Sequence, residues 1–322
     1  MSSNPLADRM QARLERAKAM RDEDKLYRHN GVLYPTLMCP EEHLRCLDGL
    51  EARDDDILLV AYPKCGFNWM VGVMKKVIAE ATQTQNESKI SPLIEFFGPE
   101  VLKDVVEAPS PRFLGTHLHP DIMPSSFSQK KTKMVVVFRN PKDTLVSYYH
   151  FCNNNPVLPS VESWDSFFSQ FMKGDVAWGS YFDYALAWNR RMDDPNVLLV
   201  TFEALKQVSP LIPQPEMEIC SHHVSCPQDL SAGIRQISSF LGFSLTEAQV
   251  QQVAAGSTFN AMKESSARSH GNMGNVIFRK GEVGDWRNHF SPEQNREMDQ
   301  AFSKHLAGTT LGAQLDYQRY CQ

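Results

Sequence analysis

The sequence predicts one α/β domain whose central parallel sheet is flanked by helices. Two observations support this fold class: short, nearly continuous apolar runs recur along the chain, and helical patterns separate them. Continuous apolar runs are typical of parallel strands buried on both faces, and their alternation with helices indicates βαβ units. In such folds the binding site lies at the carboxyl ends of the strands. The runs occupy residues 57–62, 112–116, 133–138 and 197–202.

Local signals place the other elements along the chain. Residues 1–30 are rich in charged side chains and predict a solvated helix or a loose arm, ahead of a domain at residues 31–322. Asn140 is a good helix N-cap and Pro141 suits the first helical position, so a helix begins there. Apolar residues at helical spacing predict further helices at residues 69–78, 164–172 and 181–191.

The turn after the first apolar run is the first candidate for a binding site. Residues 62–69 read Tyr-Pro-Lys-Cys-Gly-Phe-Asn-Trp, which predicts a strand, a tight turn at Lys64 and Gly66, and then a helix. This geometry directs backbone N–H groups and a helix N-terminus at a phosphate. The segment lacks the Gly-x-x-x-x-Gly-Lys-Ser/Thr pattern of nucleoside triphosphatases. We therefore predict an anion-binding turn that resembles a P-loop only in geometry.

Three further segments carry candidate site residues. Arg139 follows the third apolar run directly, and Ser147 lies eight residues later on the predicted helix. Residues 279–286 read Arg-Lys-Gly-Glu-Val-Gly-Asp-Trp, which places two adjacent cations beside a glycine that permits close backbone approach. His117 ends the second apolar run, where a neutral imidazole would suit a general base; His119 is its neighbouring competitor.

Composition limits the classes of partner. The net charge of −5 argues against non-specific nucleic-acid binding, which needs a broad basic face. No apolar run approaches the length that spans a membrane, and no signal-peptide pattern opens the sequence, so we expect no membrane association. Seven scattered cysteines, an odd number, indicate reduced thiols in the cytosol rather than a disulfide framework.

One proline-rich segment interrupts the α/β pattern. Residues 208–228 carry four prolines and predict an exposed, weakly ordered loop. Four potential zinc ligands fall inside it, but their spacing matches no common zinc site, and we expect no metal. These four residues are Cys220, His222, His223 and Cys226.

Taken together, these motifs resemble those of the cytosolic sulfotransferases and are most similar to the vertebrate family 6B branch. The resemblance runs from about residue 30 to the end of the chain, apart from an insertion at residues 208–228. It implies transfer of a sulfuryl group from 3′-phosphoadenylyl sulfate to a small acceptor, without a metal. The product of the donor is then adenosine 3′,5′-bisphosphate.

The resemblance also implies residue roles. His117 takes the acceptor's proton, and Lys64 contacts the bridging oxygen where negative charge develops. Arg139, Ser147 and residues 279–281 grip the 3′-phosphate, while Trp69 stacks on the adenine. The donor-binding set is Lys64, Cys65, Gly66, Phe67, Asn68, Trp69, Arg139, Ser147, Phe202, Ser257, Thr258, Phe259, Met262, Ile277, Phe278, Arg279, Lys280 and Gly281.

Some positions depart from the family pattern. Cys65 stands where the family usually has Ser, and Phe67 and Asn68 stand where it usually has two threonines. Gly115 stands where many relatives have a lysine that helps to hold the sulfuryl oxygens. Two alternatives stay open. Gly115 and Phe67 favour a nucleotide-binding homologue with weakened catalysis. The strand–turn–helix geometry is also shared by a P-loop nucleotide or small-molecule kinase.

The acceptor and the oligomeric state are less constrained. The acceptor group is expected to be a hydroxyl, or an amine, of a small molecule. A phenol or alcohol is expected, and the branch resemblance makes thyroxine one candidate. Relatives often dimerise through a segment that starts with a lysine and ends with a glutamate. Here Arg287 keeps the basic start, but Arg296 replaces the glutamate and Pro292 lacks a backbone donor, so we expect a monomer or a weak homodimer. Aromatic residues that could line the acceptor pocket, or could equally be core, are Phe96, Phe97, Tyr148, Tyr149, Phe151, Trp164, Phe167 and Phe168.

Overall fold

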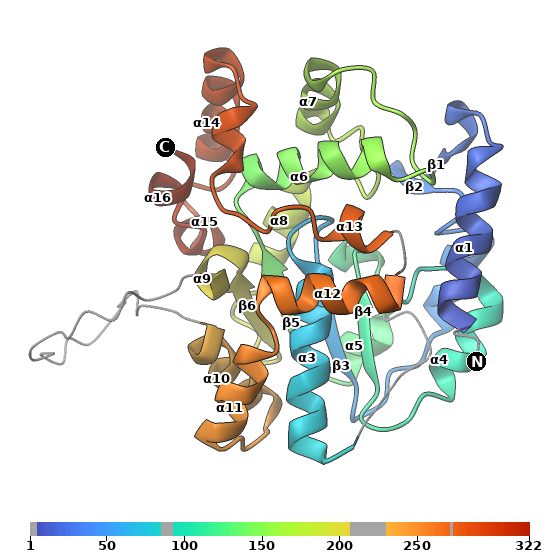
Figure 1. The fold of residues 1–322 in the computed structure, drawn as a ribbon, viewed down its shortest axis with the longest axis vertical. Coiled ribbons are helices and arrows are strands. Elements are labelled where there is room, and N and C mark those ends of the chain that lie inside the picture. Colours follow the sequence, from blue (N-terminus) through green and yellow to red (C-terminus); the bar gives the residue numbers. More distant parts are fainter. Residues whose placement is uncertain (1–4, 85–92, 207–229, 271–272) are drawn as a thin grey trace, which may run out of the picture.

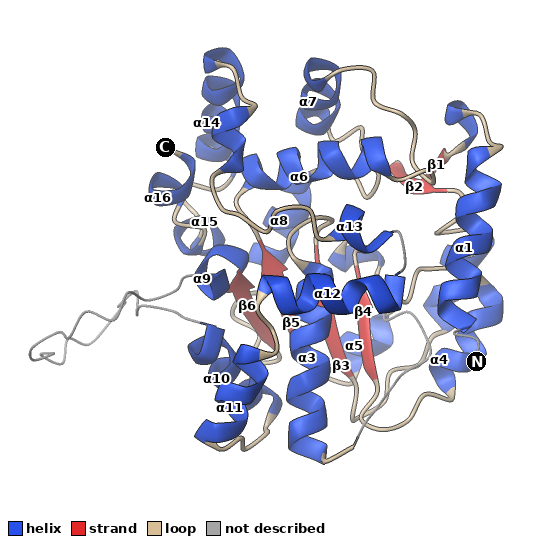
Figure 2. Ribbon diagram, in the orientation of Figure 1, coloured by secondary structure: helices blue, strands red, loops and turns tan. Residues whose placement is uncertain are grey.

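A four-stranded parallel sheet forms the centre of the structure, a computed structural model that describes residues 5–84, 93–206, 230–270 and 273–322 (Figures 1 and 2). The strand order is β4-β3-β5-β6, so the strands coincide with the predicted apolar runs and the predicted α/β class is confirmed. Val60 lies between Thr116 and Val136 in register, which aligns the carboxyl ends of the strands. The bounds are β3 (Ile57–Ala61), β4 (Phe113–Thr116), β5 (Lys133–Phe138) and β6 (Val197–Thr201).

Helices cover both faces of this sheet, which explains why its strands are apolar throughout. All five residues of β3 are buried. Helices α3 (Phe67–Thr82) and α10 (Leu230–Leu241) pack on one face, in front of the strands in Figure 1. Helix α8 (Tyr181–Asn189) lies behind them, where the ring of Tyr184 packs on Phe138 with the centroids 5.8 Å apart.

The N-terminal segment packs onto this body. Helix α1 (Pro5–Lys18) buries Ala17 fully, and the Arg9 guanidinium pairs with Asp104 at 3.1 Å. Within the charged N-terminal segment, Pro5–Lys18 therefore form a helix, one of the two expected alternatives, but one face of this helix is covered rather than solvated. A hairpin that the sequence analysis did not predict follows, β1 (Leu26–His29) and β2 (Val32–Pro35). Its turn uses an Asn-Gly pair, Asn30 and Gly31, both with positive φ, which is a strong local hairpin signal.

Capping residues set where the functional helices begin. Asn140 accepts a hydrogen bond from the Asp143 N–H at the start of α6 (Pro141–Asn154), as its sequence predicts. Ser291 forms a capping box with Gln294 at the start of α14 (Pro292–His305). The remaining α-helices are α2 (Glu41–Cys46), α4 (Leu102–Val106), α5 (Ser125–Gln129), α7 (Trp164–Lys173), α9 (Phe202–Lys206), α11 (Glu247–Ala255), α12 (Phe259–His270), α13 (Met273–Ile277), α15 (Thr310–Gln314) and α16 (Tyr317–Cys321). Short 3₁₀ turns occupy Asp22–Asp24, Leu47–Gly49, Pro99–Val101, Pro120–Ile122 and Asp285–Asn288.

The sequence also predicts an inserted loop and no membrane-spanning segment. The insertion at residues 208–228, with its cysteines and histidines, lies outside the described residues. Within the described ranges, no helix has both the length and the apolar character that a bilayer span requires.

Candidate active site

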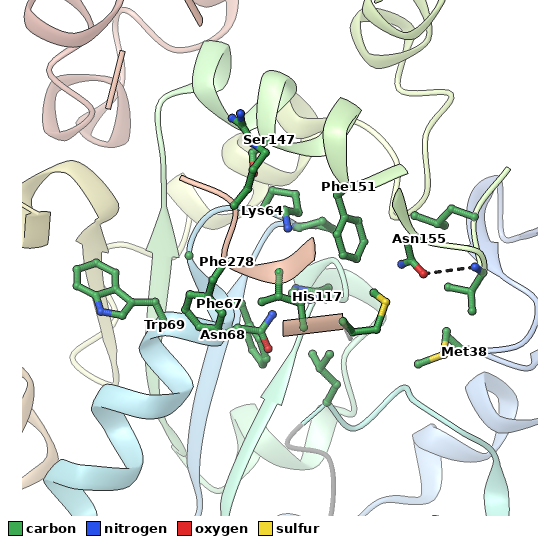
Figure 3. Close-up of a pocket in the computed structure, with 18 of the residues that line it drawn as sticks. Met38, Lys64, Phe67, Asn68, Trp69, His117, Ser147, Phe151, Asn155 and Phe278 are labelled. Atoms are coloured by element: carbon green, nitrogen blue, oxygen red, sulfur yellow. Dashed lines mark hydrogen bonds between the residues drawn. The ribbon is translucent and has the colours of Figure 1, made fainter. Parts of the chain in front are cut away.

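A pocket of about 420 Å³ opens at the carboxyl ends of the parallel strands. Each strand contributes the residue or turn that follows it: Lys64 after β3, His117 after β4, Arg139 after β5 and Phe202 after β6. This is the position that the fold class predicts for a binding site. In Figure 3, Trp69 and Met38 lie at opposite ends of the pocket, and Phe67 and His117 lie between them.

The turn between β3 and α3 has the strained backbone of a binding loop. Lys64 has φ of 70°, which is unusual for a residue with a side chain, and Gly66 has φ of 100°. A Cβ atom at Gly66 would also lie 2.8 Å from Cδ2 of Phe202, so glycine is required there on two grounds. The turn brings the N-terminus of α3 to the pocket, where its unpaired N–H groups favour an anion.

Cations gather around this turn. Burial, together with smaller effects of the nearby charges of Arg139 and Arg279, lowers the pKa of Lys64 to about 7. The Lys64 ammonium lies 4.0 Å from the centroid of the Phe151 ring, and Arg139 stacks on Phe202 at 4.6 Å. Like charges placed together in a half-buried pocket repel one another, so a bound anion would relieve the repulsion and keep Lys64 protonated.

The second basic segment closes the same end of the pocket. The Arg139 guanidinium donates to the Glu282 carbonyl at 2.6 Å, which ties β5 to the segment after α13. Arg279 and Lys280 both pair with the Asp285 carboxylate, at 2.5 and 2.6 Å. Ser147, Arg279, Lys280 and Gly281 all line the pocket with Arg139, as the sequence predicts for a phosphate site.

His117 is the imidazole that faces the pocket. Its Nδ1 lies 2.7 Å from the Ala61 carbonyl oxygen, which can only accept, so Nδ1 carries the hydrogen and Nε2 is left as an acceptor. Burial, with a smaller effect of the Lys64 charge, lowers the pKa of His117 to about 4 and keeps it neutral. His119 does not line the pocket; its Nδ1 accepts from the Asp121 N–H at 3.3 Å.

Two aromatic rings hold the imidazole. The rings of Phe67 and Trp178 lie edge-on to it, with centroids 4.7 and 5.4 Å away. Phe67 also occupies the space beside Gly115, because a Cβ atom at Gly115 would lie 2.5 Å from Cζ of the Phe67 ring. Two departures from the family pattern are therefore linked: Phe67 fills the space into which a side chain at residue 115 would extend.

Most predicted donor-binding residues line the pocket, and Trp69 is one of them, whereas four others do not line it. Trp69 donates through Nε1 to the Ser257 carbonyl at 2.7 Å, and its ring meets Phe202 edge-on at 5.4 Å. The Cys65 sulfur faces the Thr144 hydroxyl at 3.6 Å, away from the pocket, and burial raises its pKa to about 12. Besides the cationic residues, Ser147 and Gly281, the pocket-lining members are Gly66, Phe67, Asn68, Trp69, Phe202, Phe259, Ile277 and Phe278, whereas Cys65, Ser257, Thr258 and Met262 are not among the lining residues.

The far half of the pocket is apolar and was largely missed by the sequence analysis. Of the eight aromatic candidates, Phe96 and Phe151 line it; Phe97, Tyr148, Phe167 and Phe168 belong to the core, and Tyr149 packs on Trp164 at 5.3 Å. Lys206 was also missed, although it lies one helical turn after Phe202 and lines the pocket. Further lining residues that carry no motif are Met10, Leu14, Pro35, Met38, Leu93, Asn155, Val157, Leu158 and Trp178.

No metal centre accompanies this pocket in the part of the chain that the structure describes. Across residues 5–84, 93–206, 230–270 and 273–322, no group of three or more histidine, cysteine, aspartate or glutamate side chains is placed to hold a metal ion. The cysteines and histidines of the proline-rich segment lie outside these ranges.

Comparison with known proteins gives consistent matches over most of the chain. A family model described as the sulfotransferase domain matches residues 54–210 and 226–310. Sulfotransferase 6B1 of Danio rerio is 53% identical over 314 residues, which cover 97% of this chain and 99% of the relative. Sulfotransferase 6B1 of Homo sapiens is 44% identical over 309 residues, which cover 96% of this chain and 95% of the relative.

Solved structures give the same result for the fold. Mouse sulfotransferase SULT7A1, complexed with PAP, superposes with a TM-score of 0.77 at 32% identity, covering 92% of this chain and 99% of that one. Retinol dehydratase, in complex with androsterone and the inactive cofactor PAP, superposes with a TM-score of 0.67 over 96% of both chains. At 18% identity, this second likeness concerns the fold alone.

Proposed function

This chain belongs to the sulfotransferase family, and from that premise we propose which of its residues carry the transfer and what kind of acceptor it takes. The enzyme uses 3′-phosphoadenylyl sulfate as donor, in line with the solved relative that holds the bisphosphate PAP. The donor supplies an activated sulfuryl group. The roles of the pocket residues and the acceptor class below are our inference from geometry.

The clustering of Lys64, Arg139 and Arg279 carries this assignment. Burial first, and the charges of Arg139 and Arg279 second, lower the pKa of Lys64, and a polyanionic nucleotide would offset both effects. Lys64 and the N–H groups at the start of α3 bind the phosphosulfate, and Arg139, Ser147, Arg279 and Lys280 bind the 3′-phosphate. Trp69, Phe202, Phe259, Ile277 and Phe278 enclose the adenine. Arg279 and Lys280 already share Asp285, which holds both cations at the pocket wall.

His117 acts as the base in the transfer. Its Nε2 accepts the proton of the acceptor hydroxyl while the hydroxyl oxygen attacks sulfur, and Ala61 holds the ring in the tautomer that this role requires. Lys64 stabilises the negative charge that grows on the departing phosphate oxygen. Because Gly115 offers no second ammonium group, Lys64 supplies the cationic stabilisation at this position.

The acceptor is a hydroxyl compound with a flat or elongated apolar body. Support comes from the far half of the pocket, where Met38, Leu93, Phe96 and Leu158 provide apolar surface. A phenol places its ring beside Phe67 and its oxygen at His117. Thyroxine belongs to this class and is one candidate to assay.

The cellular setting and assembly form part of the same proposal. We place the enzyme in the cytosol; within the described ranges, Cys39, Cys46, Cys65, Cys152 and Cys321 are free, as expected for a reducing compartment. We also propose that it is a monomer or a weak homodimer.

Thermal stabilisation by nucleotides tests the donor site. Adenosine 3′,5′-bisphosphate should raise the melting temperature far more than AMP or ATP, because each charge-assisted contact to the 3′-phosphate contributes about 1.5–3 kcal/mol to binding. His117→Ala should keep this shift and lose sulfuryl transfer from labelled donor to a panel of phenols, steroids and thyroid hormones. Equal shifts from all three nucleotides would contradict the proposed grip on the 3′-phosphate. A shift without any transfer by the parent enzyme would favour a homologue with weakened catalysis.

A further inference from the structure

Glu95 is a buried carboxylic acid beside the end of β4. The segment that carries it runs along the edge of the sheet, where the Ile94 N–H donates to the Gly115 carbonyl at 2.9 Å. This pairing brings the Glu95 side chain to Thr116 and His117. Glu95 is 0% exposed, so it does not contact the pocket or its ligands.

Both oxygens of Glu95 accept hydrogen bonds from the strand end that carries the base. Oε1 accepts from the His117 backbone N–H at 2.8 Å, and Oε2 accepts from the Thr116 hydroxyl at 2.9 Å. The Thr116 oxygen accepts in turn from the Leu118 N–H at 3.0 Å. An ionised carboxylate satisfies this set of donors, because it has acceptors only. Glu95 therefore fixes the backbone on both sides of His117, while Ala61 fixes its ring.

The surroundings of Glu95 bring its ionisation near neutral pH. Burial raises the pKa of Glu95 to about 7, although its hydrogen bonds lower it in part. Burial also raises the pKa values of Cys39, Tyr34 and Tyr184, the titratable groups that face it, so these stay neutral at pH 7. His117 stays neutral as well, because burial lowers its pKa.

We propose that Glu95 is a positioning residue for sulfuryl transfer: as a carboxylate it holds the end of β4, and its charge stabilises the imidazolium that His117 becomes. The inference rests on the function proposed above. In the step itself, the acceptor oxygen bonds to sulfur, the bond from sulfur to the bridging oxygen breaks, and the acceptor's proton passes to Nε2 of His117. Glu95 neither receives this proton nor touches the acceptor; its charge, held 2.8 Å from the His117 backbone nitrogen, favours the protonated form of that residue.

Glu95→Gln removes the charge and keeps the shape. Its amide can still accept from the His117 N–H and can donate to the Thr116 oxygen. We expect kcat to fall about tenfold, the effect of roughly one pKa unit at the base, while the acceptor KM stays within about twofold.

In the parent, kcat should decline as pH falls through about 7, because Glu95 takes up a proton. This decline of kcat at low pH should be absent in Glu95→Gln. Glu107→Gln, an exposed acid paired with Lys103, is the matched control and should leave kcat unchanged.

Histidine NMR gives a readout that does not need activity. With isotope-labelled histidines, the ring signals of His117 are assigned as those that disappear from the spectrum of His117→Gln. The titration is then followed in a Lys64→Met background, which removes the lysine's own ionisation from the same pH range. The His117 signals should report an ionisation near pH 7 that Glu95→Gln abolishes. If Glu95→Gln does not fold, the Lys64→Met titration alone decides.

The proposal is overturned by two results. One is a His117 ring that senses no ionisation near pH 7. The other is a Glu95→Gln enzyme whose kcat falls while the KM values for donor and acceptor both change, and whose pH profile keeps the parent's shape. That combination would indicate a structural role only. Complete absence of sulfuryl transfer in the parent would instead reject the proposed function, and the NMR titration would still report on Glu95.

Discussion

At the scale of single residues, the pocket pairs a neutral imidazole with a lysine whose charge depends on its ligand. His117 stays neutral because burial lowers its pKa to about 4, and Lys64 titrates near 7 because burial and neighbouring cations disfavour its charge. Transfer needs the first group unprotonated and the second protonated. A bound polyanion supports the second requirement because it holds the lysine charged, and the charged lysine in turn lowers the pKa of His117.

A side chain at residue 115 should destabilise the protein unless Phe67 is also changed. Gly115→Lys places a Cβ atom where the Phe67 ring lies, and the ring cannot move without disturbing His117. We expect a loss of about 1–3 kcal/mol in the free energy of unfolding, as for other overpacked cores, together with lower activity. Denaturant unfolding and transfer assays measure both.

The double variant provides the control for this pair. Phe67→Thr with Gly115→Lys should recover most of the lost stability and bring a second ammonium group beside His117, so kcat should rise above that of either single variant. If the effects of the two changes on the free energy of unfolding simply added, the steric link would be contradicted, because substitutions at residues in contact are expected to be non-additive.

At the scale of elements, the ends of the strands build the donor half and the N-terminal helix completes the acceptor half. Lys64, His117 and Arg139 each follow a strand directly, so their positions depend on the register of the sheet. Helix α1 is held to the body by Arg13, which donates to the Leu37 carbonyl at 2.9 Å. Along one face of α1, Met10 and Leu14 line the pocket.

Shortening the pocket-facing side chains of α1 should weaken acceptor binding alone. Leu14→Ala should raise the acceptor KM about fivefold, because truncating a half-buried apolar side chain removes on the order of 1 kcal/mol of contact. The bisphosphate-induced melting shift should stay the same. Glu15→Ala, at an exposed neighbouring position, is the matched control. If Leu14→Ala weakened donor and acceptor binding equally, α1 would act on the fold rather than on the pocket.

At the scale of the whole molecule, the chain makes contacts of its own along the segment where the family resemblance predicts association. Ser291 caps α14 through the Gln294 N–H, and Pro292 occupies the first position of that helix. Arg287 donates to the Gln322 carbonyl at 2.6 Å, and Arg296 pairs with Glu293 at 2.8 Å. These contacts occupy the residues that a two-fold contact would use.

Light scattering at micromolar concentration should report a monomer. In a two-fold contact, Arg296 of one copy would face Arg287 of the other where a reciprocal ion pair is expected, and like charges oppose association. Arg296→Glu should therefore strengthen association if this segment is the contact. A tight dimer in the parent that Arg296→Glu leaves unchanged would place the interface elsewhere.

The sequence by itself determined the features that local physics controls. Continuous apolar runs specify strands buried on both faces, and Asn140 followed by Pro141 specifies a helix start, since both depend on neighbouring residues only. The Lys64 turn, Arg139 and the basic segment at residues 279–281 follow from motifs in the same way. Only the tertiary structure decided the rest: the packing of Phe67 into the space beside Gly115, the wall that α1 adds to the pocket, and Glu95 behind His117. Each of these joins segments distant in sequence, and no local pattern records a contact that only chain folding creates.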